Sequence, residues 1–398
     1  MAVAAAVGAW YLPAVISVGL RTDVGAHLKF AEDIGYSGTV RIPYALFEQL
    51  VIIVRTLIPF GALERISPVL GSRSATWAAT GVIVVIIAVM VCSDLVLMRM
   101  YSTMDGPPSR FDPLFPVIAT VAAMIVSPAT FMTWASHNLV LGYISITSYE
   151  NPTTNLVRPL VLLITIEFAR RSSQSTSRRS TSLLALATLL SAFAKPSFLL
   201  PFIPATLLYG VVTSFRRKRF NWQVWCLGLF LPALVAAVWQ TAVAASLSGR
   251  LTVAPLRSLR ILMALHHRPA IFFVATVVAS TLFPLVAAVF LGREMRWRRS
   301  LVLGWLTYGF GLVLFLMLSI VDRPDNGDLI WGPQLALLVV VVESLVAAYP
   351  VLSKRIRTGT YRFGIGVGGW VVVLSLLAQV VSGLFLHHQE TFHPAAWW

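Results

Sequence analysis

The sequence predicts an all-α, polytopic membrane protein with about 11 (roughly 10–12) transmembrane helices. Hydrophobic residues make up 57% of the 398 residues and charged residues only 12%, and the mean hydropathy of +0.80 is far too high for a soluble domain. Apolar runs long enough to cross a hydrocarbon core of ~30 Å recur along the whole chain. No polar stretch between them is long enough for a separate soluble domain, so we expect residues 1–398 to form a single transmembrane domain.

The basic residues lie in short clusters between the apolar runs, and these clusters account for the formal net charge of +15. Such clusters are typical of cytoplasmic loops, so we expect membrane lipids and no nucleic acid as partners. Cys92 and Cys226 fall inside apolar runs, which indicates neither a disulfide framework nor a metal site. The clusters are ARRSSQSTSRRS (169–180), FRRKRF (215–220), REMRWRR (293–299) and SKRIRTGTYR (353–362).

Long apolar runs predict transmembrane helices directly, and shorter runs predict further ones. AKPS (194–197) combines a proline with a lysine and favours a break between two short helices. If all the basic clusters are cytoplasmic, Lys195 lies at the far tip of a hairpin, and 135–155, 246–268, 322–330 and the tail after 387 lie outside. The long runs lie near 75–97, 112–134, 222–245, 269–292, 300–321, 331–350 and 363–386, and the shorter ones near 156–169, 181–194 and 197–213.

The segment 21–74 is predicted to be the first outer loop and to contain an interfacial helix. It follows a first apolar run, Met1 to Leu20, which lacks the basic start of a cleaved signal peptide. Arg21 follows that run and no cation precedes it, which locally favours the opposite orientation.

The stretch 44–62 decides between these orientations. It is apolar but carries Glu48 and Arg55 on one helical face, so it either spans the membrane or lies flat on its surface. Burial of both charges near mid-bilayer costs roughly 2.5–3.5 kcal/mol each on the insertion scale. This cost favours the flat helix and an outer placement of 21–35.

An acidic residue directly after the first span, in RTDVGAHLKFA (21–31), then an interfacial helix and many short-looped spans resemble the GT-C superfamily of membrane glycosyltransferases. The resemblance implies a polyprenyl-phosphate-linked sugar donor and carries over to Asp23 alone, because the adjacent acidic pair of many members is missing after the first span. Three further stretches are similar to segments of bacterial membrane proteins of this kind: SYENPTTNLVRPLVLL (148–163), AKPSFLLPFIPA (194–205) and NGDLIWGPQLAL (326–337).

Sugar transfer from a lipid phosphate needs a base that takes the proton of the acceptor hydroxyl. Asp23 and His27 are the candidate catalytic residues, because their spacing puts them on one helical face as an acid/base or orienting pair. The alternative is that Asp23 caps a surface helix. Glu32 and Asp33 are predicted to be solvated.

The departing phosphate needs cationic or hydrogen-bonding groups, and the candidates are Lys195, Arg158, Arg268 and His267. Lys195 between two apolar helices is costly unless an anion meets it; alternatively, it snorkels to the interface. Arg158 follows NPTTN (151–155), where an Asn-Pro turn leads into a helix whose first N–H groups can face an anion. Arg268 and His267 precede a span, where basic residues usually serve as anchors.

The candidate substrate-binding residues are Asp328, Asn326 and Trp331, in DRPDNGDLIWG (322–332). We expect a turn at Asn326 that presents Asp328 and Trp331 to the substrate, with the indole stacked on a sugar. The alternative is a tight loop with an interfacial tryptophan. The acidic residues here also offer hard oxygens to a possible divalent cation, without the regular spacing of a calcium loop.

We therefore expect an inverting GT-C-type hexosyl- or pentosyltransferase that moves a sugar from a polyprenyl-phosphate-linked donor to a glycan, lipid or protein of the cell envelope. It should be a multi-pass protein of the bacterial inner membrane, with its active site facing the periplasm or exterior. Two other classes stay open. A carrier or flippase for a lipid-linked saccharide would bury paired charges mid-membrane and show an internal repeat. An O-antigen polymerase or ligase would show one large outer loop.

Overall fold

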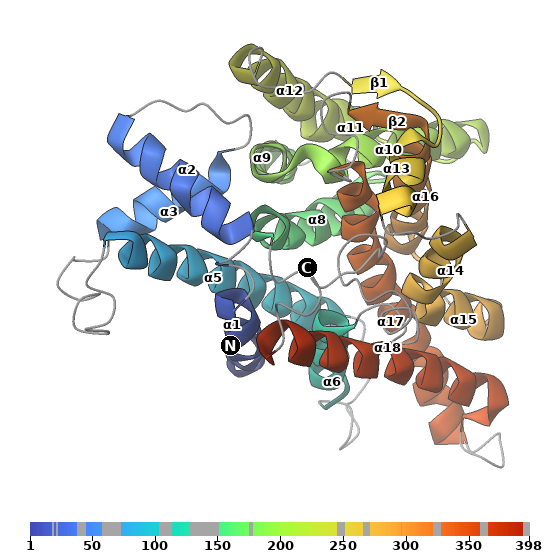
Figure 1. Cartoon of the computed structure of the whole chain (residues 1–398). Coiled ribbons are helices and arrows are strands. Elements are labelled where there is room, and N and C mark those ends of the chain that lie inside the picture. Colours follow the sequence, from blue (N-terminus) through green and yellow to red (C-terminus); the bar gives the residue numbers. More distant parts are fainter. Residues whose placement is uncertain are drawn as a thin grey trace.

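The computed structural model is a helical bundle, with its helices running mainly between two ends of the molecule (Figure 1). It describes residues 1–17, 20, 23–37, 45–57, 73–102, 114–126, 151–174, 178–244, 251–265, 271–295, 297–320, 328–358 and 365–392. The helices are α1 (Ala2–Ser17), α2 (Asp23–Ser37), α3 (Leu46–Leu57), α5 (Arg73–Tyr101), α6 (Leu114–Ile125), α8 (Pro152–Arg171), α9 (Arg178–Ala194), α10 (Leu199–Phe215), α11 (Trp222–Trp225), α12 (Leu231–Ala244), α13 (Arg257–Leu265), α14 (Ile271–Ser280), α15 (Leu282–Leu291), α16 (Arg299–Met317), α17 (Trp331–Thr358) and α18 (Gly366–Phe392); the strands are β1 (Leu251–Val253) and β2 (Leu318–Ile320).

Within these ranges, 6 helices are long and apolar enough to cross a membrane, and a bent pair makes up to 7. The long helices confirm the class of multi-pass helical membrane protein, whereas the described residues do not confirm about 11 spans. The predicted span at 112–134 is represented by α6, whose 12 residues are short for a membrane crossing. The long spans are Thr76–Tyr101, Pro196–Phe215, Trp222–Ala242, Arg299–Met317, Trp331–Ile356 and Gly366–Phe392.

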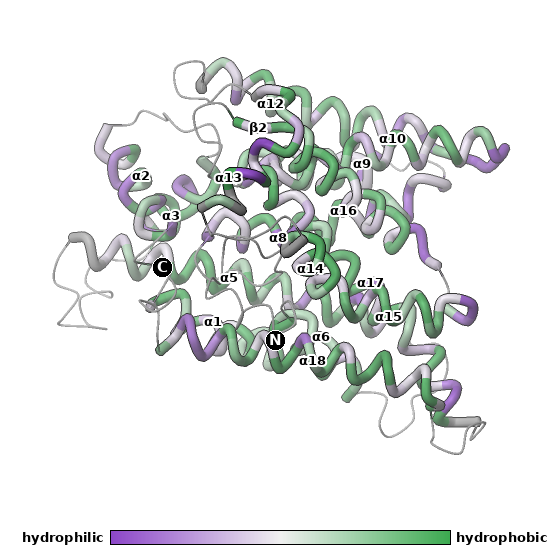
Figure 2. The backbone as a smooth tube through the Cα atoms, turned by 45° about the vertical axis from the view of Figure 1, so that its right-hand side comes forward, coloured by the Kyte–Doolittle hydropathy of each residue, from purple (hydrophilic) through white to green (hydrophobic). Residues whose placement is uncertain are grey.

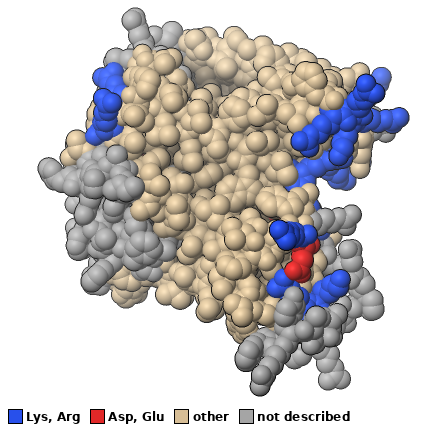
Figure 3. Space-filling model, turned by 90° about the vertical axis from the view of Figure 1, so that its right-hand side faces the viewer, with Lys and Arg blue, Asp and Glu red and all other residues tan. Residues whose placement is uncertain are grey.

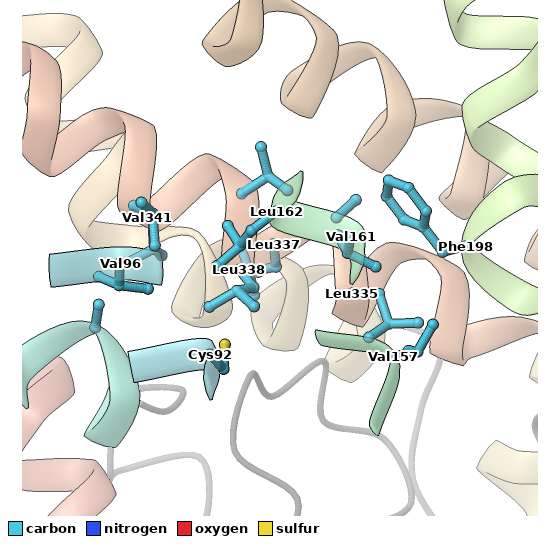
Figure 4. Packing of buried hydrophobic residues seen from close by; sticks show 14 of the residues in the cluster. Cys92, Val96, Val157, Val161, Leu162, Phe198, Leu335, Leu337, Leu338 and Val341 are labelled. Atoms are coloured by element: carbon cyan, nitrogen blue, oxygen red, sulfur yellow. The ribbon is translucent and has the colours of Figure 1, made fainter. Parts of the chain in front are cut away.

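Helix α17 forms the centre of the bundle, because residues on every face of it are buried. The run from Leu335 to Val342 is at most 1% exposed at each position. Its leucines and valines pack against Cys92 and Val96 of α5 and against Val161 of α8 (Figure 4). A helix that is apolar all round is expected only in the interior of a large protein or in a membrane.

The predicted continuous span at 269–292 is instead broken into α14 and α15, which meet at an angle of 63° around Thr281. The side chain of Gln379 on α18 compensates for the backbone bonds lost at the break. Its amide donates to the carbonyls of Ala279 and Ser280 at 3.0 and 2.9 Å, and its carbonyl accepts from the Phe283 N–H at 3.0 Å. Irregular backbone at membrane depth needs such internal partners.

The structure also contains a two-stranded antiparallel sheet, which the all-α prediction did not include. Strand β1 pairs with β2 in the register Leu251 to Ile320 and Val253 to Leu318. Helix α16 therefore ends at Met317, and the chain predicted to remain in the span up to 321 becomes extended. Strand β1 lies in the segment 246–268, which the sequence places on the side opposite the basic clusters, whereas β2 comes from the predicted span at 300–321.

The four basic clusters meet at one end of the bundle, which we call the basic end. The N–H of Asn221 donates to the carbonyl of Ser172 at 2.7 Å, and the guanidinium of Arg299 donates to the hydroxyl of Ser173. An ion pair joins Arg355 to Glu294. These contacts bring together the described parts of the clusters 169–180, 293–299 and 353–362 and the residue that follows the cluster 215–220, as expected if they share one side of a membrane.

Apolar side chains cover much of the surface between the two ends. Figure 2 shows hydrophobic residues along the lengths of the helices, and Figure 3 shows Lys and Arg gathered mainly at one edge of a broad uncharged face. Exposed apolar residues on this surface include Leu208, Val235, Val289 and Val313. A belt of this kind fits a lipid environment and not water.

Helices α2 and α3 lie together at the end opposite the basic end, beside the beginnings of α5 and α8 (Figure 1). Helix α3 has 12 residues, so it is only ~18 Å long and too short to cross a ~30 Å core. The chain leaves α1 and enters α5 at this same end, since Ser17 of α1 donates to the carbonyl of Glu390 near the end of α18. The flat placement of 44–62 stays a prediction, because residues 44 and 58–62 lie outside the described residues.

Candidate functional site

The first turn of α8 organises a polar site at the end opposite the basic end. Asn151 is the N-cap of α8, and its side-chain oxygen accepts from the Thr154 N–H and from the Thr153 hydroxyl, both at 2.8 Å. Pro152 fits the first helical position, where a missing N–H costs nothing. The Asn-Pro turn predicted from NPTTN is therefore a helix start, and the cap uses the oxygen of Asn151 while leaving its NH₂ for another partner.

Asp23 is the partner of the Asn151 NH₂ group. Its Oδ2 accepts from the Asn151 Nδ2 at 2.8 Å, which ties the first residue of α2 to the cap of α8. Asn151 is 5% exposed, whereas Asp23 is exposed, so the bond lies at the border between the interior and the surface. The carboxylate that follows α1 is thus oriented by a neutral amide.

Lys195 reaches the same turn from the break between α9 and α10. It has extended backbone and precedes the 3-10 turn Pro196–Phe198, as the proline in AKPS predicts. Its Nζ donates to the Thr154 hydroxyl at 3.0 Å and lies 3.8 Å from the centre of the Trp331 ring. The side chain is 7% exposed, so Lys195 is buried at the tip of the hairpin and does not snorkel into water. One face of the Trp331 ring is therefore in contact with an ammonium group.

Arg158 lies one turn further along α8 and is 1% exposed. Its Nη1 donates to the Asn155 Oδ1 at 2.7 Å and to the Tyr11 hydroxyl at 3.4 Å. Tyr11 belongs to α1 and donates its own proton to the carbonyl of Met124 at 2.7 Å. The guanidinium is therefore positioned by two uncharged side chains.

His27 contacts Glu48 and not Asp23. The His27 Nδ1 lies 2.5 Å from the Glu48 Oε1, and Glu48 is 0% exposed on the first turn of α3. This pair joins α2 to α3, and the rings of Phe30 and Phe47 pack edge-on against the imidazole. The spacing of Asp23 and His27 allowed a local pair, but within the described residues each bonds to a side chain of another helix.

The other predicted site residues are less completely placed. His267, Arg268 and Asn326 lie outside the described residues, as do Asp322 and Asp325. The backbone of Asp328 begins a 3-10 turn that leads directly into Trp331. No group of three His, Cys, Asp or Glu side chains suited to a metal ion occurs in the described part of the chain.

Asn151, Thr154, Asn155 and Tyr11 are site residues that the sequence analysis did not assign. The first three form the beginning of α8, and an Asn-Pro pair before an apolar run is a readable N-cap signal. Nothing in the sequence marked Tyr11 as a site residue. It lies in the apolar run from Met1 to Leu20, and tyrosines are common in membrane-associated segments.

The site brings one carboxylate, Asp23, and two cations, Lys195 and Arg158, to the first two turns of α8. Each of these three side chains donates to or accepts from a neutral amide or hydroxyl at the beginning of α8. A carboxylate can accept a proton, and cationic groups beside it can bind an anion. The arrangement suits a reaction in which a proton is removed and an anionic group departs.

The long apolar helices and the polar site at one end, of which Lys195 and Arg158 are buried and Asp23 is exposed, define a multi-pass membrane protein with a site at the edge of its helical bundle. No family model matches the sequence, and no curated protein matches it. Among solved structures, ArnT from Cupriavidus metallidurans bound to undecaprenyl phosphate is similar over 98% of this chain and 75% of that chain, at 13% sequence identity and a TM-score of 0.50. The same protein in the apo state covers 98% and 74%, with a TM-score of 0.49. The chain therefore shares its helical fold with ArnT.

Proposed function

We propose that the protein is a membrane glycosyltransferase that moves a sugar from a polyprenyl-phosphate-linked donor to an acceptor hydroxyl. The similarity in fold to ArnT, which was crystallised with undecaprenyl phosphate, supports the class of donor. The reaction takes place at the end opposite the basic end. By the positive-inside rule this is the outer face of a bacterial inner membrane, where a glycan, lipid or protein of the cell envelope supplies the acceptor.

One observation carries the proposal: the Asp23 carboxylate and the Lys195 ammonium are held on the same first turn of α8, through Asn151 and Thr154. A base and a cation placed this way fit the two groups that react with the sugar in a glycosyl transfer, the acceptor hydroxyl and the leaving phosphate. The base faces the incoming hydroxyl, and the cation faces the phosphate that leaves.

In the reaction, Asp23 takes the proton of the acceptor hydroxyl as its oxygen bonds to the anomeric carbon of the sugar. The bond from that carbon to the phosphate oxygen breaks, and the phosphate retains both electrons. The donor phosphodiester becomes a lipid phosphomonoester with one more negative charge, while the carboxylate becomes a neutral acid. A single displacement of this kind inverts the configuration at the anomeric carbon, and the sugar is a hexose or a pentose.

The test uses Asp23→Asn in purified, reconstituted protein supplied with undecaprenyl phosphate-linked hexoses and pentoses and with an envelope extract as acceptor. The amide retains the size of the carboxylate but cannot accept the proton. Release of undecaprenyl phosphate should therefore fall about a hundred- to ten-thousandfold, with donor binding nearly unchanged. Asp33→Asn is the matched control, since Asp33 is exposed on the same helix. Equal turnover by the native protein and Asp23→Asn would remove Asp23 as the base.

A carrier for a lipid-linked saccharide is the second candidate, because the structure contains a buried charge pair of the kind that a carrier is expected to have. Arg99 of α5 donates to both carboxylate oxygens of Glu343 on α17 at 2.7 Å, and Ser300 donates to the same group at 2.6 Å. Glu343 is 0% exposed.

Movement of a fluorescent lipid-linked sugar across proteoliposomes separates the two functions. A carrier moves the lipid without an acceptor and loses this activity in Glu343→Gln. The surface carboxylate Glu294, which pairs with Arg355 at the basic end, supplies the control Glu294→Gln. A transferase shows turnover that depends on Asp23 and no movement above that of empty vesicles.

A further inference from the structure

Arg158 is a buried arginine without a carboxylate partner among the described residues. Its side chain is 1% exposed, and its Nη2 is buried with no hydrogen-bond partner in the part of the chain that the structure describes. Arginine is almost never fully buried unless it is paired, because an uncompensated charge in a low-dielectric interior is costly. Within the described part of the chain, the fold therefore maintains a cation without a counter-ion.

The guanidinium points toward the site. Long side chains on a helix lean toward the N-terminus of the helix, and the bond from Arg158 to Asn155 shows that this one does. Asn155 directly follows Thr154, whose hydroxyl accepts from Lys195. Arg158 and Lys195 thus bond to adjacent residues at the beginning of α8. Asp23 bonds to the cap of the same helix, Asn151.

The groups that position the guanidinium leave its charge uncompensated. Tyr11 donates its proton to the carbonyl of Met124, so its oxygen is available to accept from Arg158. Asn155 accepts through an amide oxygen at 2.7 Å, where an aspartate of nearly the same shape would neutralise the cation. A purely structural arginine would be better served by that aspartate, because a buried ion pair offsets part of the cost of burial.

We propose that the counter-ion of Arg158 is the lipid phosphate that leaves in the transfer reaction, and that Tyr11 and Asn155 are positioning residues that hold the guanidinium ready for it. The inference rests on the proposed function. The donor phosphodiester carries one negative charge, whereas a phosphomonoester carries about 1.5 to 2 at pH 7. Lys195 binds the charge already present on the donor. Arg158 binds the charge that appears as the bond breaks, so it stabilises the transition state more than the bound donor.

The test is Asn155→Asp in the full-length protein, with undecaprenyl phosphate as the probe. The change places a carboxylate beside Arg158 at nearly unchanged shape. The affinity for undecaprenyl phosphate should fall about ten- to a hundredfold, while the temperature of thermal unfolding stays the same or rises. In the transfer assay, kcat should fall by a larger factor than KM rises. A structural role predicts an equal or higher unfolding temperature with no change in affinity.

Three controls sharpen the result. Binding of undecaprenol, which lacks the phosphate, should be the same in Asn155→Asp and the native protein. Asn221→Asp makes the same change at the basic end and should leave phosphate affinity unchanged. Tyr11→Phe should weaken undecaprenyl phosphate binding several-fold, whereas Tyr308→Phe should not, because the buried Tyr308 hydroxyl has no hydrogen-bond partner among the described residues.

Native affinity for undecaprenyl phosphate in folded Asn155→Asp and Tyr11→Phe overturns the inference, even if transfer depends on Asp23. Another result would distinguish this inference from the proposed transfer reaction. If the native protein binds undecaprenyl phosphate in an Arg158-dependent way but releases none from any sugar donor, the phosphate site stands and the transfer reaction does not.

Discussion

The Asp23 carboxylate and the Asn151 amide meet at 2.8 Å although 128 positions separate them in the sequence. Asn151 also caps α8, so one side chain both starts a helix and orients a carboxylate. The two tasks use different atoms, the oxygen for the cap and the NH₂ for Asp23. They can therefore be separated by mutation.

Asn151→Ser should keep α8 intact and disorient Asp23. A serine hydroxyl is about as good an N-cap as asparagine, so the unfolding temperature should change little. It is too short to replace the amide as a donor to Asp23, so turnover should fall, with donor affinity nearly unchanged. Asn151→Ala removes both functions and should also lower stability by about 0.5–2 kcal/mol. Native turnover in Asn151→Ser would show that the bond to Asp23 does not orient the base.

The proposed placement of α2 on the outer face is tested by cysteine labelling in intact cells, in a background with Cys92 and Cys226 replaced. Ser37 is exposed at the end of α2, so Ser37→Cys should react with an impermeant thiol reagent. Lys218→Cys at the exposed basic end should react only after the membrane is opened. The reverse pattern would place Asp23 on the cytoplasmic side and exclude an outer catalytic base.

Lys195→Ala should raise the KM for the lipid-linked donor about ten- to a hundredfold, because it removes a charged hydrogen-bond donor from the proposed phosphate site. Lys195→Arg should recover part of the loss, since an arginine retains the charge and stacks on Trp331. Lys218→Ala at the basic end is the control. Equal loss of folded protein in both Lys195 variants, measured by size-exclusion profile and unfolding temperature, would indicate a structural role instead.

The His27–Glu48 pair should contribute to stability more than to turnover. His27→Leu leaves the buried Glu48 carboxylate without its partner, which should destabilise the protein by about 1–3 kcal/mol. The double variant His27→Leu/Glu48→Leu should recover part of this loss, because an apolar pair replaces a buried polar one. Thermal unfolding of the two single variants and the double variant measures the coupling. Strictly additive losses would show that the two side chains do not interact, and a loss of turnover as large as that of Asp23→Asn would give His27 a role in the chemistry.

Local patterns in the sequence were sufficient to predict much of the scaffold. The apolar runs near 75–97, 222–245, 331–350 and 363–386 correspond to α5, α12 with the turns before it, α17 and α18. These predictions succeed because a span needs only length and hydropathy, both of which are properties of consecutive residues. The break at 269–292 was missed, because the partner that makes it tolerable is Gln379, which lies on another helix.

The sequence by itself determined where polar residues and breaks interrupt the apolar chain: Asp23 after the first apolar run, an Asn-Pro helix start at 151, and Lys195 at a proline break. Each follows from local rules, because caps, breaks and the cost of burying a charge act over a few residues. Only the tertiary structure decided which groups meet. It paired Asp23 with Asn151 and His27 with Glu48, and it enclosed Arg158 between α1 and α8. The spacing of residues along one helix limits which contacts are possible. The packing of helices far apart in the sequence selects among these contacts, because burial makes an unpaired polar group costly.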